Sequence, residues 1–190
     1  RKLELVFSGA NYPWGPGEVY RYRTVDTFVL AAAMDSLLKR REGPSANLWD
    51  RLTEEVLKPI GINVAPMLHT VESDGGRGVP ILGAGLYVTV DEVAKIAALL
   101  HNGGRHGDQQ LLHPTKLTDA LTLGLTHGKP TAWVDYGNEH HYYLSLWHLN
   151  VDLSDCSITV PTMVGFGGNI VQLLPLGVTS FYFEDGGRWN

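Results

Sequence analysis

The 190-residue sequence has a single cysteine, Cys156, so it can form no internal disulfide bond and no cysteine cluster for a metal ion. It has no apolar run approaching the roughly 20 residues of a membrane-spanning helix. Its first residues, Arg1-Lys2-Leu3-Glu4, do not resemble a signal peptide. Dense positive charge is also scarce. The one basic run, Lys39-Arg40-Arg41, belongs to a chain of formal net charge -5, which argues against nucleic acid as a partner.

The composition is that of a globular protein, with 44% hydrophobic and 18% charged residues. A chain of this length buries about 70% of the surface that it exposes when unfolded. That is enough apolar burial for one core. The sequence shows no internal repeat and no low-complexity segment.

Helical signals dominate the first part of the chain. Thr24 or Asp26 can cap a helix of mostly apolar residues, which ends before Gly43-Pro44. Apolar residues at spacings of three and four from Trp49 to Val56 predict a second helix. Pro59 should stop this helix because it lacks the backbone donor that a helix interior requires.

The middle of the chain contains a connection and a well-marked helix. Between Ile60 and Pro80 the density of Pro, Gly, Asp and Asn predicts an ordered connection without regular structure. Thr89 and Glu92 form a capping box, which predicts a helix up to Leu100. Asn102-Gly103-Gly104 supplies the stop for this helix.

The last third changes from helical to strand patterns. Pro114 suits the first position of a helix. The inner stripe of this helix comprises Leu117, Leu121 and Leu125. Runs of β-branched and aromatic residues then predict three antiparallel strands, Tyr142–Val151, Val164–Leu174 and Val178–Glu184, with Pro175-Leu176-Gly177 as a tight connection between the last two. The chain is therefore predicted to be α+β, with helices packed on an antiparallel sheet.

Two motifs carry chemical information: Tyr22-Arg23-Thr24-Val25-Asp26-Thr27 at the start of the first helix, and Gly165-Phe166-Gly167-Gly168-Asn169 before a strand. Together with other short segments they resemble the serine β-lactamase and penicillin-binding-protein superfamily, particularly its esterase-like and 6-aminohexanoate-oligomer-hydrolase-like branch. The resemblance covers nearly the whole chain. The other segments are Pro16-Gly17, Val56–Ile62, Gly85–Thr89, Asn102–Gly104 and the last two strands.

The resemblance implies a partial β-lactamase/transpeptidase-like fold and acyl-enzyme hydrolysis of an ester, an amide or a β-lactam-like substrate, without a cofactor. It implies that Tyr22 is the catalytic tyrosine and that Thr24 donates a hydrogen bond nearby. A phenol with a reference pKa of about 10 is a poor base at neutral pH, and lowering its pKa by three units represents roughly 4 kcal/mol. Tyr22 therefore needs a nearby ammonium. The alternative is that Tyr22 is a partly buried aromatic residue at a helix entrance.

The second motif implies a substrate-binding segment made of Phe166, Gly167, Gly168 and Asn169. Relatives commonly have Lys or His where this chain has Gly167, so a cation for a substrate carboxylate is missing. This departure argues against penicillin-like substrates and leaves neutral esters or amides. Glycines here still permit close approach of the backbone to a ligand. The alternative is a glycine-rich strand entrance that is needed only for packing.

The nucleophile of this family, a serine with a lysine three residues later, should precede Tyr22. Only Ser8 is found there, and Asn11 stands three residues after it. The chain, residues 1–190, is therefore predicted to be the C-terminal portion of one β-lactamase-like domain and to be inactive alone. A second chain or a symmetry-related copy is predicted to cover the unpaired sheet edge at Val178–Glu184. The resemblance also favours an extracytoplasmic location.

Other readings of the sequence stay open. The chain can be a complete, non-catalytic binding domain on a degenerate hydrolase scaffold. Independent catalysis through Ser36 or a histidine is a third reading, but Ser36 and Lys39 follow the tyrosine and lie near the solvated end of a helix, as a surface pair does. The eight histidines lack the spacing of a known metal site and are interpreted as solvated loop or rim residues. Several aromatic residues can line an apolar pocket but are more typical of a core: Trp14, Trp133, Tyr136, Trp147 and Phe166.

Overall fold

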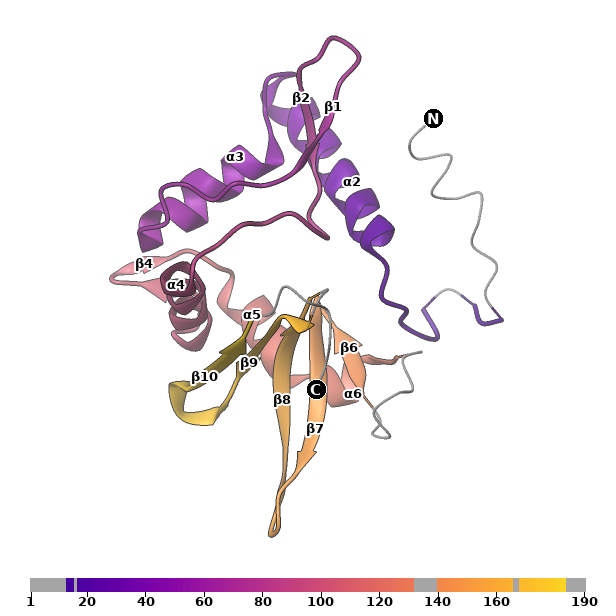
Figure 1. The fold of residues 1–190 in the computed structure, drawn as a ribbon, viewed down its shortest axis with the longest axis vertical. Coiled ribbons are helices and arrows are strands. Elements are labelled where there is room, and N and C mark those ends of the chain that lie inside the picture. Colours follow the sequence, from indigo (N-terminus) through magenta and orange to yellow (C-terminus); the bar gives the residue numbers. More distant parts are fainter. Residues whose placement is uncertain (1–12, 16, 132–139, 166–167, 184–190) are drawn as a thin grey trace. The chain divides into compact units, whose positions relative to one another are not determined.

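A computed structural model describes residues 13–15, 17–131, 140–165 and 168–183. It divides the chain into two compact units (Figure 1). Unit 1 comprises, among the described residues, Arg23–Ile96. Unit 2 comprises Pro13–Tyr22 and the chain from Ala97 onward. Helices and antiparallel sheets occur together, so the predicted α+β class is confirmed at this level.

Unit 1 begins with the long helix α2 (Thr24–Glu42). The predicted cap at Thr24 or Asp26 is wrong, because Arg23 precedes the helix in an extended conformation and makes no side-chain capping bond. The predicted end is confirmed: Gly43, with φ 106°, donates its N–H to the Lys39 carbonyl at 3.0 Å. Glycine adopts this conformation without steric cost.

The next helical run is longer and less regular than predicted. Asn47 caps α3 (Leu48–Leu52), which continues as a π-helical turn, η1 (Thr53–Leu57), and a 3₁₀ turn, η2 (Lys58–Ile60). Pro59 lies inside η2 and does not stop the run. Proline is tolerated at the start of a short helical turn because its missing donor has no partner there. Gly61, with φ 80°, ends the run instead.

The segment predicted as a connection contains a β-hairpin, so that prediction is wrong in part. Strands β1 (His69–Val71) and β2 (Arg77–Pro80) pair antiparallel. The turn between them includes Gly75 with φ 83°, and the Glu72 N–H donates to the Gly76 carbonyl at 2.9 Å. The segment contains so many turn-forming residues that the sequence pattern of its two short strands cannot be recognised.

Helix α4 (Val90–His101) starts and ends as predicted. The Thr89 N–H donates to Glu92 Oε2 at 2.7 Å, and the Glu92 N–H donates to Thr89 Oγ1 at 3.3 Å. This reciprocal pair is a capping box. After the helix, Gly103 and Gly104 both have positive φ, and the Gly104 N–H donates to the Leu99 carbonyl at 2.9 Å.

The helical part of unit 2 is partly as predicted. A short hairpin, β3 (Arg105–His106) and β4 (Gln109–Gln110), precedes α5 (Pro114–Thr122) and α6 (Gly124–His127). Pro114 occupies the first turn of α5, which confirms its predicted place. The inner stripe does not extend to Leu125, which is exposed, because the helix is interrupted at Leu123.

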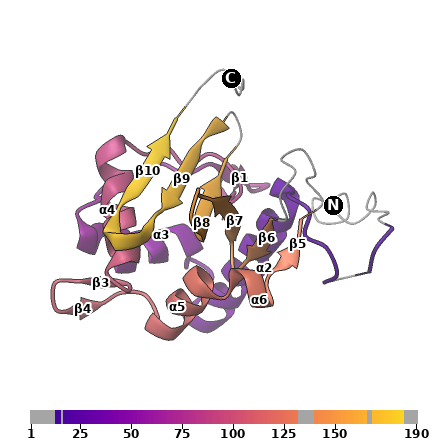
Figure 2. The same ribbon diagram turned by 90° about the horizontal axis from the view of Figure 1, so that it is seen from below.

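The sheet of unit 2 has six antiparallel strands in the order β10-β9-β8-β7-β6-β5 (Figures 1 and 2). Its strands are β5 (Lys129–Pro130), β6 (His141–Tyr143), β7 (Leu146–Asp152), β8 (Ser157–Val164), β9 (Ile170–Leu173) and β10 (Thr179–Tyr182). Helix α6 packs on β6 and β7. Residues of β7, β8 and β9 contribute to the buried core of this unit.

The predicted strands are found in this sheet, with two corrections. The run Tyr142–Val151 is a hairpin rather than one strand, because Leu144 and Ser145 form a turn with positive φ. The run Val164–Leu174 joins the end of β8 to β9, and most of β8 was not predicted. The connection at residues 175–177 is confirmed: the Leu174 N–H donates to the Val178 carbonyl at 2.9 Å, and β9 and β10 pair antiparallel.

Candidate functional site

The segment that carries Tyr22 is anchored to the sheet of unit 2 through its main chain. The Tyr20 N–H donates to the Pro130 carbonyl at 2.9 Å, and Tyr20 forms a parallel bridge with Thr131. The Tyr22 ring centroid lies 6.4 Å from that of Trp147 on β7. Tyr22 is 38% exposed, so its ring is accessible to a ligand.

An aromatic cluster supports this position. The rings of Tyr20 and Tyr142 stack at 3.5 Å, and both meet the Trp147 ring edge-on at 5.8 Å. Trp147 is only 5% exposed, so it belongs to the core rather than to an open pocket wall. Aromatic pairs in these geometries favour one arrangement of their rings. The cluster therefore accounts for the position of Tyr22 whether this residue is catalytic or serves only in packing.

The glycine-rich motif lies at the same end of the sheet. Trp147, near the start of β7, pairs with Thr162, near the end of β8, and Gly165 follows Thr162 by three residues, or about 10 Å along the strand. The Gly165 N–H donates to the Asn169 carbonyl at 2.8 Å, which closes the turn. Gly168 has φ 87°, a conformation that favours glycine. Phe166 and Gly167 lie outside the described residues.

Thr24 belongs to unit 1, where it has a packing role. A Cβ atom added at Gly83 would lie 2.9 Å from Thr24 Cγ2 and 3.0 Å from the Thr24 carbonyl oxygen. The start of α2 therefore fits closely against the loop that contains Gly83. The role of Thr24 as a hydrogen-bond donor to a substrate stays a prediction.

The electrostatics of Tyr22 oppose its use as a base in this chain alone. Burial and, secondarily, the neighbouring Tyr142 raise the pKa of the Tyr22 phenol above its ordinary value. The phenol is therefore protonated at neutral pH. A nearby cation has to reverse this shift before Tyr22 can accept a proton.

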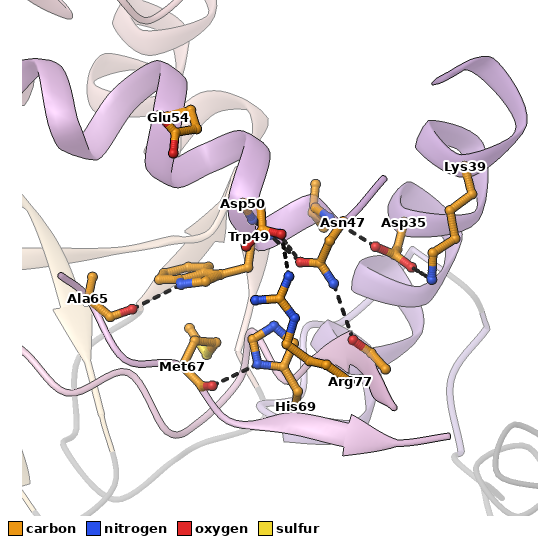
Figure 3. Close-up of polar contacts among 12 residues, drawn as sticks. Asp35, Lys39, Asn47, Trp49, Asp50, Glu54, Ala65, Met67, His69 and Arg77 are labelled. Carbon is orange, nitrogen blue, oxygen red and sulfur yellow. Dashed lines mark hydrogen bonds and ion pairs between the residues drawn. The ribbon is translucent and has the colours of Figure 1, made fainter. Parts of the chain in front are cut away.

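Ser36 and Lys39 lie in unit 1 and line, with Asp35, an open hollow of about 390 Å³. Lys39 Nζ lies 2.8 Å from Asp35 Oδ2, while Asp35 Oδ1 accepts the Leu48 N–H at 2.9 Å (Figure 3). The Lys39 ammonium is thus held by a buried carboxylate. The contact engages Lys39 with Asp35 rather than with Ser36, which argues against catalysis by Ser36.

The sequence predicted that the histidines are solvated loop or rim residues, and this prediction is wrong for His148. His148 on β7 is fully buried. The start of β7, Leu146–His148, is buried on both faces of the sheet, so alternation offered no signal for the environment of His148. Within the described ranges, no group of three or more His, Cys, Asp or Glu residues is placed to hold a metal ion.

Comparison with protein-family models, with curated proteins and with solved structures finds no match for this chain. The features of the chain that bear on its function are therefore the two motifs and the geometry around Tyr22. Of the helices in the described part of the chain, none combines the length and apolar character that crossing a membrane requires.

Proposed function

We propose that the chain is the C-terminal portion of a β-lactamase-like serine hydrolase, in which Tyr22 is the acid–base group and the backbone at Gly165, Gly168 and Asn169 lines the acyl site. The observation that carries this proposal is the sheet of unit 2, where Tyr22 beside Trp147 and the closed turn with Gly168 lie at one end of neighbouring strands. Acyl transfer requires an acid–base residue close to a stretch of backbone that the ligand can approach.

The chemistry needs two groups from elsewhere. A serine hydroxyl attacks the acyl carbon and expels the alcohol or amine of the substrate, while a lysine and Tyr22 pass the serine proton to this leaving group. Water then hydrolyses the acyl-serine, which releases the acid and restores the serine hydroxyl. Before Tyr22 the sequence contains only Ser8, which has Asn11 rather than lysine three residues later, so it does not supply this pair. The serine and lysine therefore belong to a polypeptide portion outside these 190 residues.

The substrate is a neutral ester or amide. Gly167, which stands in the place of a cationic or imidazole side chain, offers no counter-charge to a substrate carboxylate. The backbone at Gly168 has no side chain, so a ligand can approach it closely.

The composition of the β10 edge supports a partner polypeptide. In the part of the chain that the structure describes, β10 pairs with β9 alone. Residues 178–183 contain no charge and no proline, and Val178, Phe181 and Phe183 are exposed. The opposite edge, β5, is guarded by Lys129, Pro130 and the Tyr20 main chain. Charges and prolines are the usual protection of free edges, so β10 is the edge that a second chain, or a copy of this one, would cover.

A labelling experiment tests the catalytic proposal. A polypeptide that extends upstream of Arg1 should form a stoichiometric adduct with an activated phosphonate, and the adduct should lie on a serine followed three residues later by lysine. The 190-residue chain should form none. An adduct on Ser36, or an upstream sequence that lacks this serine and lysine, would contradict the proposal.

A second candidate is a non-catalytic binding domain on the same scaffold. It is favoured by the protonated Tyr22 phenol and by the ion pair that holds Lys39. A stable monomer without adduct formation, encoded with no upstream serine and lysine pair, would support this candidate over the hydrolase.

A further inference from the structure

His148 is an unusual core residue. It is fully buried on β7, and neither ring nitrogen makes a hydrogen bond with a described residue. Buried polar groups in proteins are nearly always hydrogen-bonded, so an imidazole in this state calls for an explanation. The proposed hydrolase does not use His148.

Helix α6 rests directly on this imidazole. A Cβ atom added at Gly124 would lie 1.9 Å from His148 Cγ, so only glycine allows the helix to approach this closely. At the other end of α6, a Cβ atom at Gly128 would lie 3.1 Å from His141 Cβ. His141 on β6 is the cross-strand partner of His148, and its Nδ1 is also buried without a hydrogen bond to a described residue.

We propose that His141 and His148, with α6 seated on them, form an acid-sensitive latch in which protonation of His148 separates α6 from β6 and β7. A charged imidazole is unfavourable in this site, because the ring is fully buried and neither of its nitrogens makes a hydrogen bond with a described residue. Protonation of His148 therefore favours the open form, in which water can reach the ring.

The pKa of His148 agrees with this geometry. Burial lowers the pKa of His148 most. The main chain of Ala120 on α5 acts in the opposite direction, although its geometry falls short of a hydrogen bond. The charge of His141 lowers the pKa further. Other titratable groups lie on the elements packed around His148. They are His140 before β6, His127 on α6, whose ring is exposed and faces Tyr143 at 6.0 Å, and Lys116 and Asp119 on α5. The residues of β8 that pair with the start of β7, Pro161 and Thr162, do not titrate.

The direction of the pH effect follows from this lowered pKa. In the open form His148 binds a proton near its ordinary pKa of 6.5, whereas in the closed form it stays neutral. The closed form is therefore fully favoured above that pH. Below that pH its advantage falls, and the fall approaches about tenfold per pH unit as long as closed His148 remains neutral.

Opening of the latch would also change the structure of the candidate site around Tyr22. Tyr142 follows His141 on β6, and Trp147 precedes His148 on β7, so the same two strands carry the aromatic cluster around Tyr22 on their other face. Separation of α6 from these strands would loosen that cluster. The latch itself does not depend on the proposed hydrolase activity.

Hydrogen exchange on the whole chain, corrected for intrinsic rates, tests the latch. From pH about 6.5 to about 5.5, the opening constants of amides in α6, β6 and β7 should rise about fivefold, while those of α4 should not. His148→Leu should abolish this rise, and His106→Gln, at an exposed histidine on β3, should leave it unchanged. The same rise in His148→Leu, or no rise in the unmodified protein, would overturn the proposal.

A second measurement covers the case in which His148→Leu does not fold. In the unmodified, folded protein, the His148 imidazole carbon resonance should stay at its neutral position through the ordinary titration range of histidine. A His148 resonance that titrates with an ordinary histidine pKa in the closed form would overturn the latch.

Discussion

Removal of the Asp35 carboxylate should destabilise unit 1 far more than removal of an exposed carboxylate. Asp35 is 1% exposed on α2, and its two oxygens have different partners. Oδ1 accepts the N–H of Leu48, the first residue of α3, and Oδ2 meets Lys39 Nζ (Figure 3). Next to Leu48, Asn47 caps α3 through its side-chain oxygen and donates its Nδ2 to the Gly78 carbonyl of β2 at 3.3 Å. Asp35 therefore links α2 to the junction of α3 and the hairpin.

The expected loss of stability on removal of the Asp35 carboxylate follows from these contacts. Loss of a hydrogen bond to a charged acceptor costs about 1.5–3 kcal/mol. The Lys39 side chain is one third exposed, so its ion pair adds no more than about 1 kcal/mol. Asp35→Ala should thus lower the free energy of unfolding by about 2–4 kcal/mol. Asp35→Asn keeps an acceptor for the Leu48 N–H and should cost about half as much.

Glu54 provides a matched control in the same unit. It forms an ion pair with Lys58 one helical turn later, and both side chains are exposed. Glu54→Ala should cost no more than about 0.5 kcal/mol. Urea unfolding followed by circular dichroism gives the free energies, and hydrogen exchange of α2 and α3 assigns the loss to unit 1. If Asp35→Ala and Glu54→Ala lower the free energy of unfolding by the same amount within about 0.5 kcal/mol, the buried carboxylate does not stabilise the junction of α2 and α3.

Three further substitutions test the packing of α6 on His148 and the roles of Tyr22 and Gly167. Gly124→Ala should lower the free energy of unfolding of unit 2 by about 1–3 kcal/mol, because its methyl group would overlap the His148 ring; an unchanged urea midpoint would contradict this. In the longer, active polypeptide, Tyr22→Phe should reduce acyl transfer by about 10²- to 10⁴-fold with little change in ester binding, and full turnover would reduce Tyr22 to a packing residue. In the same polypeptide, Gly167→Lys should shift kcat/KM toward substrates with a carboxylate. Equal rates of the unmodified enzyme with benzylpenicillin and a neutral short ester would count against that reading.

The sequence predictions that are confirmed depend on few neighbouring residues. The capping box at Thr89 and Glu92 needs only one turn of chain, and the glycines after α2 and α4 act through their own backbone conformation. The connection at residues 175–177 is equally local. These signals can be recognised without knowledge of what surrounds them.

The predictions that are wrong concern places where local signals compete or are missing. The turn at Leu144 and Ser145 contains neither Gly, Asn nor Asp, so the sequence offered no break between β6 and β7. Strands β1 and β2 were obscured by the turn residues between them. For the site, the sequence singled out Tyr22, Gly168 and Asn169, but their place at one end of the sheet depends on the register of β7 and β8, and most of β8 was not predicted.

The sequence by itself determined the α+β class, the ends of several helices and the motifs that suggest acyl transfer, because caps, turns and periodicity act over a few residues. Only the tertiary structure decided which polar side chains are buried and what they meet. Asp35 reaches the backbone of Leu48, and the ring of His148 fits against Gly124. Such environments are made by segments distant in the chain, and burial of a charged or titratable group follows from the packing of those segments rather than from the residues next to it.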